Sequence, residues 1–355
     1  QEHRMKTRAA VYLGVGKPLA IDEVELPELQ PSQVLVKSMA SGICHSQLHQ
    51  IHDPRQHAPA VLGHEGTGLV LETGDHVEHV TKGDKVILTW LPRNPYPGMA
   101  RPEPPFFRYK GEDARSGFQY SAWADTTVVD QAFVVKLPDD MPTDVTSIVG
   151  CAIMTGAGAV INAARVRIGD SVAVFGLGGV GLAVVQACAN SGAYPIIVVD
   201  LNDEKLEFAK KFGATHFVNA AKQDPVEAIR AMTNGGVDFS FDAIGAPKTL
   251  QQFFPVVRPG ISGVSDGGMA VLVGVPQGTT ELAMGGLLAN RMLRGTSGGS
   301  GRPDRDFPMY LRWYKEGKMP LDLLVSRRYR LDEINEGLAD LERGAIAGRA
   351  IVVFD

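Results

Sequence analysis

Hydrophobic and polar positions change their pattern near Gly150, and this change divides the chain into two kinds of domain. Before Gly150, short apolar runs are broken by Gly, Pro and Asp, and no long helical period appears. Runs of this kind predict β-strands. They cover residues 34–39, 68–72, 85–89 and 132–136, so we expect a β-rich, partly barrel-like domain.

After Gly150, short continuous apolar runs alternate with helical stretches. Residues 171–175 and 196–200 are two such runs, and the helices that follow them extend to about Asn190 and Phe212. Further strands are predicted at residues 216–218, 237–242, 270–274 and 292–295. Strands that alternate with helices are typical of a parallel sheet covered on both faces, so this part predicts a doubly wound α/β domain.

The C-terminal part returns to mixed structure. Residues 304–316 and 332–342 predict two helices, with Asp332 as the N-cap of the second, and residues 350–354 predict a closing strand. A cofactor domain inserted between two parts of one catalytic domain fits this order. We therefore assign residues 1–153 and 297–355 to the catalytic domain and residues 154–296 to the cofactor-binding domain.

Composition narrows the classes of protein. The 355 residues carry a formal net charge of −5 without a block of like charge, which argues against a nucleic-acid or anionic-membrane partner. No apolar run approaches the ~20 residues that a membrane helix needs, and the polar N-terminal residues do not resemble a signal peptide. Three cysteines are too few for a disulfide framework, so we expect a cytoplasmic protein.

A glycine-rich turn follows the first buried strand and opens a helix, and it has the spacing G-x-G-x-x-G. Such a turn lets the backbone approach a pyrophosphate and places the anion at a helix N-terminus. The second strand ends in Asp200, whose carboxylate can bind ribose hydroxyls and would repel a 2′-phosphate. The pattern therefore predicts NAD rather than NADP, although Asp200 could instead only cap the next helix. The turn comprises Gly176, Gly178, Gly179, Val180 and Gly181.

Two of the three cysteines have a histidine as a candidate partner in a metal site. Cys44, His64 and Cys151 together would supply two thiolates and one imidazole, which is the set that alcohol dehydrogenases use for catalytic zinc. These soft donors suit zinc better than magnesium or calcium. Spacing alone leaves the alternative open that Cys44 and Cys151 are small buried hydrophobic residues. Cys188, in the helix after the glycine turn, is expected to pack in the core.

The motifs together resemble those of the zinc-containing medium-chain alcohol dehydrogenases, from Gly42 to Phe354. The resemblance rests on Gly-His-Glu-Gly at 63–66, Gly-Asp-Lys-Val at 83–86, the glycine turn at 176–181, Gly-Gly-Val-Asp-Phe-Ser-Phe at 235–241 and Val-Gly-Val-Pro at 273–276. It implies a GroES-like β-barrel catalytic domain joined to a Rossmann domain with a doubly wound parallel sheet. It also implies Cys44, His64 and Cys151 as the ligands of one catalytic zinc ion.

The resemblance further implies roles for single residues. Glu65 would lie beside the metal, Ser46 would take the substrate proton, His49 would relay it, and Trp90 would line the substrate pocket. His45 and Arg349 would contact the cofactor phosphates, and Asp200 and Lys205 the ribose. Beyond the glycine turn, the cofactor-binding residues would be His45, Thr155, Asp200, Lys205, Val275 and Arg349, with Thr155 near the nicotinamide and Val275 also next to the substrate pocket.

Two features depart from that family's pattern. Members often hold a second, structural zinc with four closely spaced cysteines, but residues 92–118 contain no cysteine. We therefore expect no Cys₄ zinc, and we expect the Pro- and Arg-rich segment 92–110 to form a loop, either as plain surface or as a lid or subunit contact. The family usually has Asp where Gln47 stands, so the orientation of His64 is in question.

The expected function is reversible hydride transfer between a small alcohol and NAD, as in an NAD-dependent alcohol dehydrogenase. One alternative is a dehydrogenase of S-hydroxymethyl thiol adducts, for which the arginines at 93, 101 and 108 could bind a carboxylate. Another is a non-catalytic nucleotide-binding protein on the same scaffold. We expect a homodimer or homotetramer, in which the strand near residues 292–295 pairs across a two-fold axis.

Overall fold

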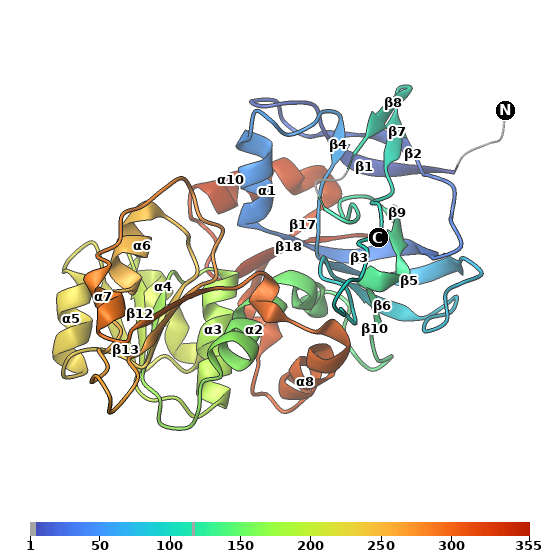
Figure 1. Cartoon of the computed structure of the whole chain (residues 1–355). Helices are drawn as coiled ribbons and strands as arrows, with labels where there is room; N and C mark the ends of the chain where they lie inside the picture. Colours follow the sequence, from blue (N-terminus) through green and yellow to red (C-terminus); the bar gives the residue numbers. More distant parts are fainter. Residues whose placement is uncertain (1–4, 116–117) are drawn as a thin grey trace. The chain divides into compact units, whose positions relative to one another are not determined.

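The structure is a computed structural model and describes residues 5–115 and 118–355. The chain folds into two compact units. Unit 1 comprises Gln1–Cys151, Arg302–Phe307 and Leu321–Asp355, and unit 2 comprises Ala152–Gly301 and Pro308–Pro320. Figure 1 shows that the N-terminal and C-terminal parts of the chain belong to the same β-rich unit.

Unit 2 is built on a parallel sheet. Within the described residues, its six strands have the order β13-β12-β11-β14-β15-β16. The order reverses between β11 and β14, and open sheets of this kind bind ligands at the carboxyl ends of the strands at that point. The predicted doubly wound fold is therefore confirmed. The strands are β11 (Val172–Phe175), β12 (Ile196–Asp200), β13 (His216–Asn219), β14 (Phe239–Asp242), β15 (Met269–Leu272) and β16 (Met292–Gly295).

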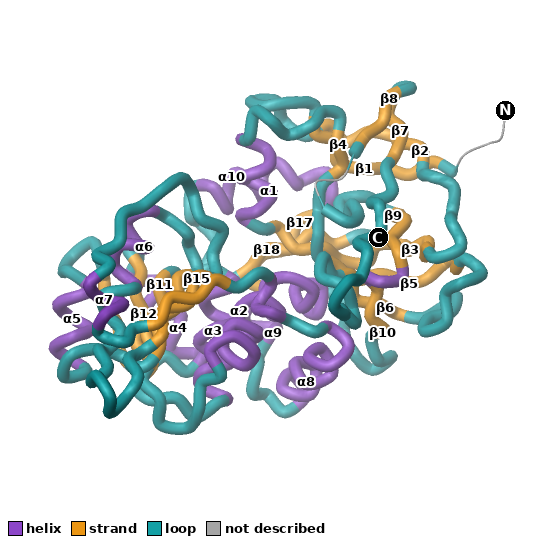
Figure 2. The backbone as a smooth tube through the Cα atoms, viewed as in Figure 1, coloured by secondary structure: helices purple, strands orange, loops and turns teal. Residues whose placement is uncertain are grey.

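Helices cover this sheet because its central strands are apolar on both sides. Along β11, Ala173 and Phe175 point to one face and pack with Ile229 and Leu250 of the covering helices, while Val172 and Val174 point to the other face and are equally buried. Figure 2 shows helices around these strands. The helices are α3 (Gly179–Asn190), α4 (Asp203–Ala209), α5 (Pro225–Met232), α6 (Pro247–Phe253) and α7 (Gly285–Leu288).

Unit 1 contains two mainly antiparallel sheets in the part of the chain that the structure describes. The five-stranded sheet has the order β4-β1-β2-β7-β8, and the seven-stranded sheet runs β10-β6-β5-β3-β18-β17, with β9 pairing with β3. The first sheet consists of β1 (Lys6–Tyr12), β2 (Ala20–Glu25), β4 (Ala60–Val61), β7 (Phe107–Tyr109) and β8 (Glu112–Ala114). The second consists of β3 (Gln33–Ile43), β5 (Gly66–Thr73), β6 (Lys85–Leu88), β9 (Thr126–Asp130), β10 (Val134–Lys136), β17 (Val325–Arg330) and β18 (Arg349–Val353).

The C-terminal strand completes unit 1. Strand β18 pairs with β3 in the register Ala350↔Ile43 and Ile351↔Gly42, so segments that are distant along the chain meet in one sheet. The remaining helices are α1 (His45–His52), α8 (Pro303–Lys315), α9 (Leu321–Leu324) and α10 (Ile334–Glu342).

A helical run from Val145 to Ala164 corrects one expectation. It consists of 3-10 turns (Val145–Ile148), π turns (Val149–Ile153 and Ala159–Ala164) and α2 (Met154–Gly158). Its 20 residues are long and apolar enough to cross a membrane, contrary to the expectation from the sequence, and 89% of its most apolar window is buried in the protein. A buried core helix passes the same test, so this run is weak evidence for a membrane span.

Two local predictions need correction. Residues 92–106 form a loop as expected, but the Pro- and Arg-rich segment ends in strand β7, which pairs with β2 and forms a hairpin with β8. Asp332 does not cap a helix, because it lies in a 3-10 turn (Leu331–Glu333) before α10 begins at Ile334. Its carboxylate instead pairs with Arg8 at 3.2 Å.

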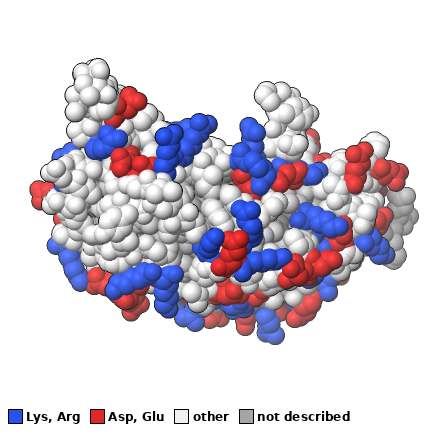
Figure 3. Space-filling view, turned by 90° about the horizontal axis from the view of Figure 1, so that it is seen from below, with Lys and Arg blue, Asp and Glu red and all other residues white. Residues whose placement is uncertain are grey.

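Charged side chains of both signs are interspersed on the face shown in Figure 3. Many charged side chains form ion pairs at the surface. In one example, Nη2 of Arg328 lies 2.7 Å from Oδ2 of Asp144. Exposed pairs of this kind contribute about 0–1 kcal/mol each, so the stability of both units comes mainly from their apolar cores.

Residues 92–115, which we call the lobe, contain no cysteine and include the hairpin β7–β8. The hairpin gives a test of what stabilises the lobe. Phe107 is 3% exposed and packs with Tyr109 and Ala114, whereas its neighbour Phe106 is 41% exposed. We expect Phe107→Ala to lower the free energy of unfolding by about 3–5 kcal/mol, because it leaves a cavity. Phe106→Ala, the control, should change it by less than about 0.5 kcal/mol. Urea unfolding followed by circular dichroism measures both, and equal effects would contradict packing as the support of the lobe.

Candidate metal centre and nucleotide site

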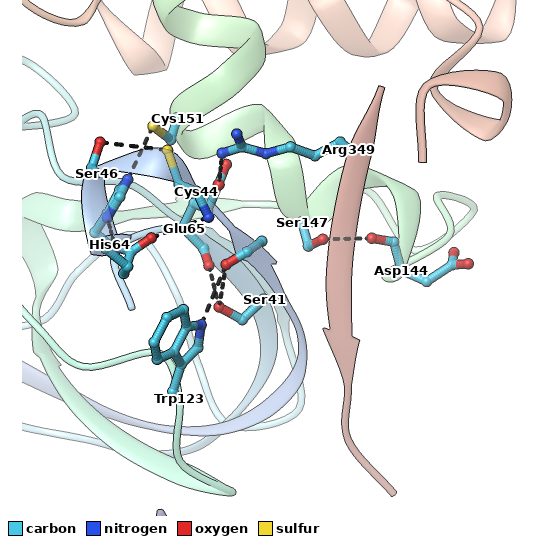
Figure 4. A network of polar contacts seen from close by, with 12 residues as sticks. Ser41, Cys44, Ser46, His64, Glu65, Trp123, Asp144, Ser147, Cys151 and Arg349 are labelled. Atoms are coloured by element: carbon cyan, nitrogen blue, oxygen red, sulfur yellow. Dashed lines mark hydrogen bonds and ion pairs between the residues drawn. The ribbon is translucent and has the colours of Figure 1, made fainter. Parts of the chain in front are cut away.

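Three segments of unit 1 bring the predicted metal ligands together. Cys44 follows the end of strand β3 and starts helix α1, His64 and Glu65 lie between β4 and β5, and Cys151 lies in the helical run that begins at Val145. The donor atoms of these four side chains all lie within 4.8 Å of one another, and all four residues are buried. The Nε2 atom of His64 is 3.2 Å from Cys151 Sγ. The cluster therefore presents two sulfurs and one imidazole nitrogen toward a common point (Figure 4).

Buried neighbours orient the imidazole of His64. The side chain of Gln47 contacts Nδ1 of the ring and is itself fully buried. The hydroxyl of Tyr120 donates a hydrogen bond to the backbone oxygen of His64 at 2.7 Å. The ring of Phe118 lies 4.4 Å from the imidazole, measured between centroids. Since Nδ1 faces Gln47, Nε2 is the nitrogen left for a metal ion.

An ion pair lies behind the cluster. Arg349, at the start of β18, donates through Nη2 to Oε1 of Glu65, and both side chains are almost completely buried. Glu65 fits because Gly42 has no side chain, and a Cβ on Gly42 would lie 2.2 Å from Oε1. Figure 4 shows Arg349 reaching from its strand toward Glu65 and the two sulfurs. A positive charge is thus held next to the thiols.

This arrangement shifts the pKa values of the two thiols in opposite directions. The hydrogen bond from Cys151 and the charge of Arg349 hold the pKa of Cys44 well below its usual value, against the effect of burial. The same hydrogen bond, together with burial, raises the pKa of Cys151. Burial raises the pKa of Glu65, while Arg349 opposes this rise. These surroundings favour the thiolate form of Cys44, which is the form that binds metal ions.

Residues of helix α1 lie at the edge of the cluster. Ser46 places its hydroxyl 3.5 Å from Cys44 Sγ and is partly exposed. His49 follows three positions later, on the same side of the helix, and is also partly exposed. His45 is exposed. The proton-relay and phosphate roles of these residues stay predictions.

The glycine turn of unit 2 has the geometry of a phosphate cradle. Gly176 has a φ of +89°, and Gly181 packs so tightly that a Cβ would lie 1.8 Å from the backbone oxygen of Gly176. A Cβ on Gly178 would meet no atom within 4 Å, so the backbone there is open to a ligand. Gly179 and Val180 begin helix α3, whose free N–H groups face the same side.

Other predicted cofactor contacts of unit 2 lie near the carboxyl ends of its strands. Asp200 ends β12, and its Oδ2 accepts the N–H of Leu177 at 2.9 Å, which ties it to the turn. Lys205 is partly exposed on α4, and Val275 is 54% exposed after β15. Thr155 is buried, and its hydroxyl has no partner among the described residues. An orphaned buried hydroxyl is the feature expected next to a missing ligand.

Comparison with known proteins identifies the domains of the chain. Residues 30–139 match the alcohol dehydrogenase GroES-like domain, and residues 179–316 match the zinc-binding dehydrogenase domain. The chain is 34% identical to S-(hydroxymethyl)glutathione dehydrogenase of Paracoccus denitrificans, over 99% of this chain and 100% of the relative. It is 35% identical to alcohol dehydrogenase class-3 of Cereibacter sphaeroides, with the same coverage.

The chain belongs to the zinc-dependent medium-chain alcohol dehydrogenase family. Similar solved structures agree with this assignment and with the predicted GroES-like and Rossmann domains. An alcohol dehydrogenase zinc-binding domain protein from Burkholderia ambifaria has a TM-score of 0.90 at 31% identity, covering 99% of this chain and all of its own. Benzyl alcohol dehydrogenase from Acinetobacter calcoaceticus has a TM-score of 0.87, also at 31% identity and the same coverage. This alcohol dehydrogenase is therefore an NAD-dependent oxidoreductase.

The sequence analysis missed two groups near the predicted metal ligands of this alcohol dehydrogenase. Phe118 packs against the imidazole of His64 with the rings tilted by 40°, and it lies 6.1 Å from the ring of Trp90, measured between centroids. No motif marked Phe118, because its contacts are with residues distant in the chain. Arg349 was expected at a phosphate, and the structure gives it Glu65 as a partner, while its Nε atom has no partner among the described residues. The phosphate contact stays a prediction.

Two glycines of the turn should respond differently to alanine. We expect Gly178→Ala to keep the melting temperature but to weaken NADH binding by about tenfold or more, because its methyl group would occupy the space of the pyrophosphate. Gly181→Ala should lower the melting temperature, since its Cβ would clash with Gly176. Thermal unfolding and fluorescence titration with NADH measure both. Unchanged NADH affinity in Gly178→Ala would count against the cradle.

Proposed function

We propose that this enzyme interconverts small alcohols with aldehydes or ketones and uses a single zinc ion held by Cys44, His64 and Cys151. The observation that carries the proposal is the convergence of these three side chains, whose donor atoms with that of Glu65 lie within 4.8 Å of one another. Residues 92–118 contain no cysteine, so a Cys₄ structural zinc has no ligands there.

The donor set fits zinc on chemical grounds. Two thiolate sulfurs and one imidazole nitrogen are a donor set that would hold a catalytic zinc ion. When bound there, zinc acts as a Lewis acid that lowers the pKa of an alcohol. The protein supplies a fixed imidazole, a thiolate on Cys44 and the charge of Arg349, all in a buried place.

Residues of α1 would move the proton that the alcohol loses. The Ser46 hydroxyl lies next to the sulfur of Cys44, so it can accept a hydrogen bond from an oxygen atom bound beside the cluster. His49 is partly exposed and can pass the proton toward water. Glu65 forms an ion pair with Arg349, so it lies beside the ligands and takes no part in the relay.

The nucleotide site of unit 2 fits NAD, which accepts the hydride. Gly176, Gly178 and Gly181 leave an open backbone for the pyrophosphate. The carboxylate of Asp200 favours ribose hydroxyls over a 2′-phosphate, with Lys205 as a second ribose contact. Thr155, with its orphaned hydroxyl, would lie near the nicotinamide. Further contacts are proposed for Gly179, Val180, Val275, His45 and Arg349.

The substrate side of the metal cluster is aromatic. Phe118 contacts the imidazole of His64, and Trp90 lies beside Phe118. Aromatic faces bind apolar and aromatic groups, so we expect alcohols with apolar substituents to be favoured. The structural relative from Acinetobacter calcoaceticus acts on benzyl alcohol by its name, which supports this expectation.

A second candidate function is oxidation of an S-hydroxymethyl thiol adduct. The curated relatives named S-(hydroxymethyl)glutathione dehydrogenase favour it. Of the three arginines expected to bind a carboxylate, Arg93 pairs with Asp304, and Arg108 pairs with Asp113. Arg101 donates to the backbone oxygen of Trp90 at 3.0 Å and has no carboxylate partner among the described residues. It is therefore the arginine best placed for such an adduct.

Assembly and location remain part of the proposal. Strand β16 has a neighbour on one side only among the described strands, and all four of its residues are exposed. Two copies pairing along β16 would cover Met292 and Leu293, so we propose a homodimer or homotetramer. Its three cysteines are free and buried, which suits the reducing cytoplasm.

Removal of one sulfur tests the metal assignment. We expect Cys44→Ser to lose zinc and to reduce kcat by at least about 10³-fold, while NADH still binds, because the nucleotide turn lies in unit 2. Cys188→Ser is the matched control, since Cys188 is equally buried but packs in α3. Zinc content by atomic emission, turnover of benzyl alcohol and NADH titration give the three readouts. A Cys44→Ser enzyme with full turnover and no zinc would refute the proposal.

A formaldehyde assay separates the two candidate functions. If the second function holds, glutathione should raise the rate of NAD reduction with formaldehyde by about tenfold or more, because the adduct adds carboxylates that Arg101 can bind. Arg101→Gln should then lose most of this gain and keep its rate with benzyl alcohol. Arg55→Gln, at an exposed arginine paired with Asp53, serves as control. A rate independent of glutathione leaves plain alcohols as the substrates.

A further inference from the structure

A buried carboxylate at the end of strand β14 is not among the predicted cofactor contacts. Asp242 is the last residue of β14 and is 0% exposed. In the parallel sheet of unit 2 it pairs with Phe175, which directly precedes the glycine turn. Open sheets bind ligands at the carboxyl ends of the strands where the strand order reverses, and β11 and β14 are the two strands at that point. Asp242 therefore lies next to the nucleotide site while it stays buried.

The hydrogen bonds that the described residues give to this carboxylate come from the segment that follows β14. Oδ1 of Asp242 accepts the backbone N–H groups of Ile244 at 2.7 Å and of Gly245 at 2.9 Å. Oδ2 accepts the hydroxyl of Thr249 in helix α6 at 2.7 Å. One side chain thus ties residues 243–246, which we call the β14 loop, both to the end of the strand and to the next helix.

The β14 loop packs against two segments that the cofactor is expected to touch. On one side, a Cβ on Gly176 of the glycine turn would clash with the side chain of Ile244. Ile244 is still 37% exposed, so it forms part of the surface beside the open backbone of the turn. On the other side, a Cβ on Gly245 would clash with the backbone oxygen of Val275, a predicted cofactor contact. The position of the loop therefore affects the shape of the nucleotide site.

The charge of Asp242 is not what makes this residue useful to the fold. Burial raises the pKa of Asp242 above its usual value, and the hydrogen bonds from Gly245, Thr249 and Ile244 only oppose that rise. A carboxyl group with a raised pKa is harder to ionise in the folded protein than in the unfolded chain, so its charge lowers the free energy of unfolding at neutral pH. The role of Asp242 therefore lies in the geometry of its hydrogen bonds.

We propose that Asp242 is a positioning residue that holds the β14 loop in place, so that Ile244 forms an apolar wall of the NAD site. A loop that is ordered before its ligand arrives loses less conformational entropy on binding. Supporting hydrogen bonds of this kind keep binding residues within about 0.5 Å of their productive positions. The inference rests on the proposed nucleotide site of unit 2, and it does not depend on the metal ligands.

Two variants of the carboxylate test its role in the loop. Asp242→Ala removes the acceptor, so we expect it to weaken NADH binding by about tenfold or more and to speed hydrogen exchange at the amides of Ile244 and Gly245 in the enzyme without NADH. Asp242→Asn should keep NADH affinity within about threefold, because an amide oxygen can accept both N–H groups and the amide nitrogen can donate to Thr249. The Thr249 hydroxyl would then donate to the backbone oxygen of Ala246, which lies 3.0 Å away.

A double-mutant cycle shows whether Asp242 acts through Ile244. Ile244→Ala alone should weaken NADH binding by about tenfold, because it removes apolar contact area. If the carboxylate serves to hold Ile244, the addition of Ile244→Ala to Asp242→Ala should weaken binding by less than about a further threefold, since the wall is already displaced. Effects of the two substitutions that multiply in full would overturn the inference.

Asp238 is the matched control at the opposite end of the same strand. It directly precedes β14, and its carboxylate accepts the N–H of Ser171 at 2.8 Å and Nε–H of Arg258 at 2.6 Å. The amino ends of the parallel strands lie away from the nucleotide site, so Asp238→Ala should lower the melting temperature and leave NADH affinity within about twofold. An equal loss of NADH affinity in Asp238→Ala and Asp242→Ala would contradict a positioning role.

The readouts are fluorescence titration with NADH, thermal unfolding and hydrogen exchange, and none of them requires turnover. An Asp242→Ala enzyme that binds NADH as tightly as the unchanged enzyme overturns the inference, while the proposed function stands because NADH is still bound. If Asp242→Ala does not fold, Thr249→Val removes only the bond to Oδ2 and should weaken NADH binding by about threefold. Unchanged affinity in Thr249→Val and Ile244→Ala would then overturn the inference. An unchanged enzyme that does not bind NADH would remove both the inference and the proposed function.

Discussion

The buried cluster of Cys44, His64 and Cys151 is the constraint on which the rest of unit 1 depends. Ionised groups are costly to bury unless an opposite charge lies close by. Arg349 supplies that charge, and Glu65 shares it through an ion pair that fits only because Gly42 lacks a side chain. Arg349 begins strand β18, which pairs with β3 just before Cys44. The last strand of the chain therefore contributes a charged side chain to the surroundings of the predicted metal ligands.

Features governed by local rules could be predicted from the sequence. The glycine turn, the acid at the end of β12 and the alternation of strands and helices each depend on a few neighbouring residues and on well-defined backbone geometry. The structure accordingly contains the parallel sheet, with its order reversing at β11, and an open backbone at Gly178. The candidate ligands could be proposed for another reason. With only three cysteines and one Gly-His-Glu-Gly motif in the chain, the choices were few, and the structure brings Cys44, His64 and Cys151 together.

Features that depend on distant partners could not be predicted in this way. Proline in residues 92–110 favours a loop, yet Phe107 and Tyr109 form a strand, because β2 offers them a free edge and an apolar face. Asp332 has the residue type of an N-cap, but Arg8, far away in the chain, takes its carboxylate. Phe118 and Arg349 acquire their roles only through contacts with His64 and Glu65. Tertiary contacts override the local preferences of residues 92–110 and of Asp332. For Phe118 and Arg349, the sequence around them gives no sign of the contacts that they make.

Under the proposed assignment, metal and fold are largely separate in this enzyme. A lobe that lacks cysteines cannot draw stability from a structural zinc, and here Phe107, Tyr109 and Ala114 join a core that extends to Val11 and Val128. Large apolar side chains buried in this way contribute about 1.5–3 kcal/mol each. The predicted metal ligands, in contrast, are held in place by buried hydrogen bonds and one ion pair between groups of the protein. Under this assignment the zinc ion would serve the chemistry, while apolar packing stabilises the fold.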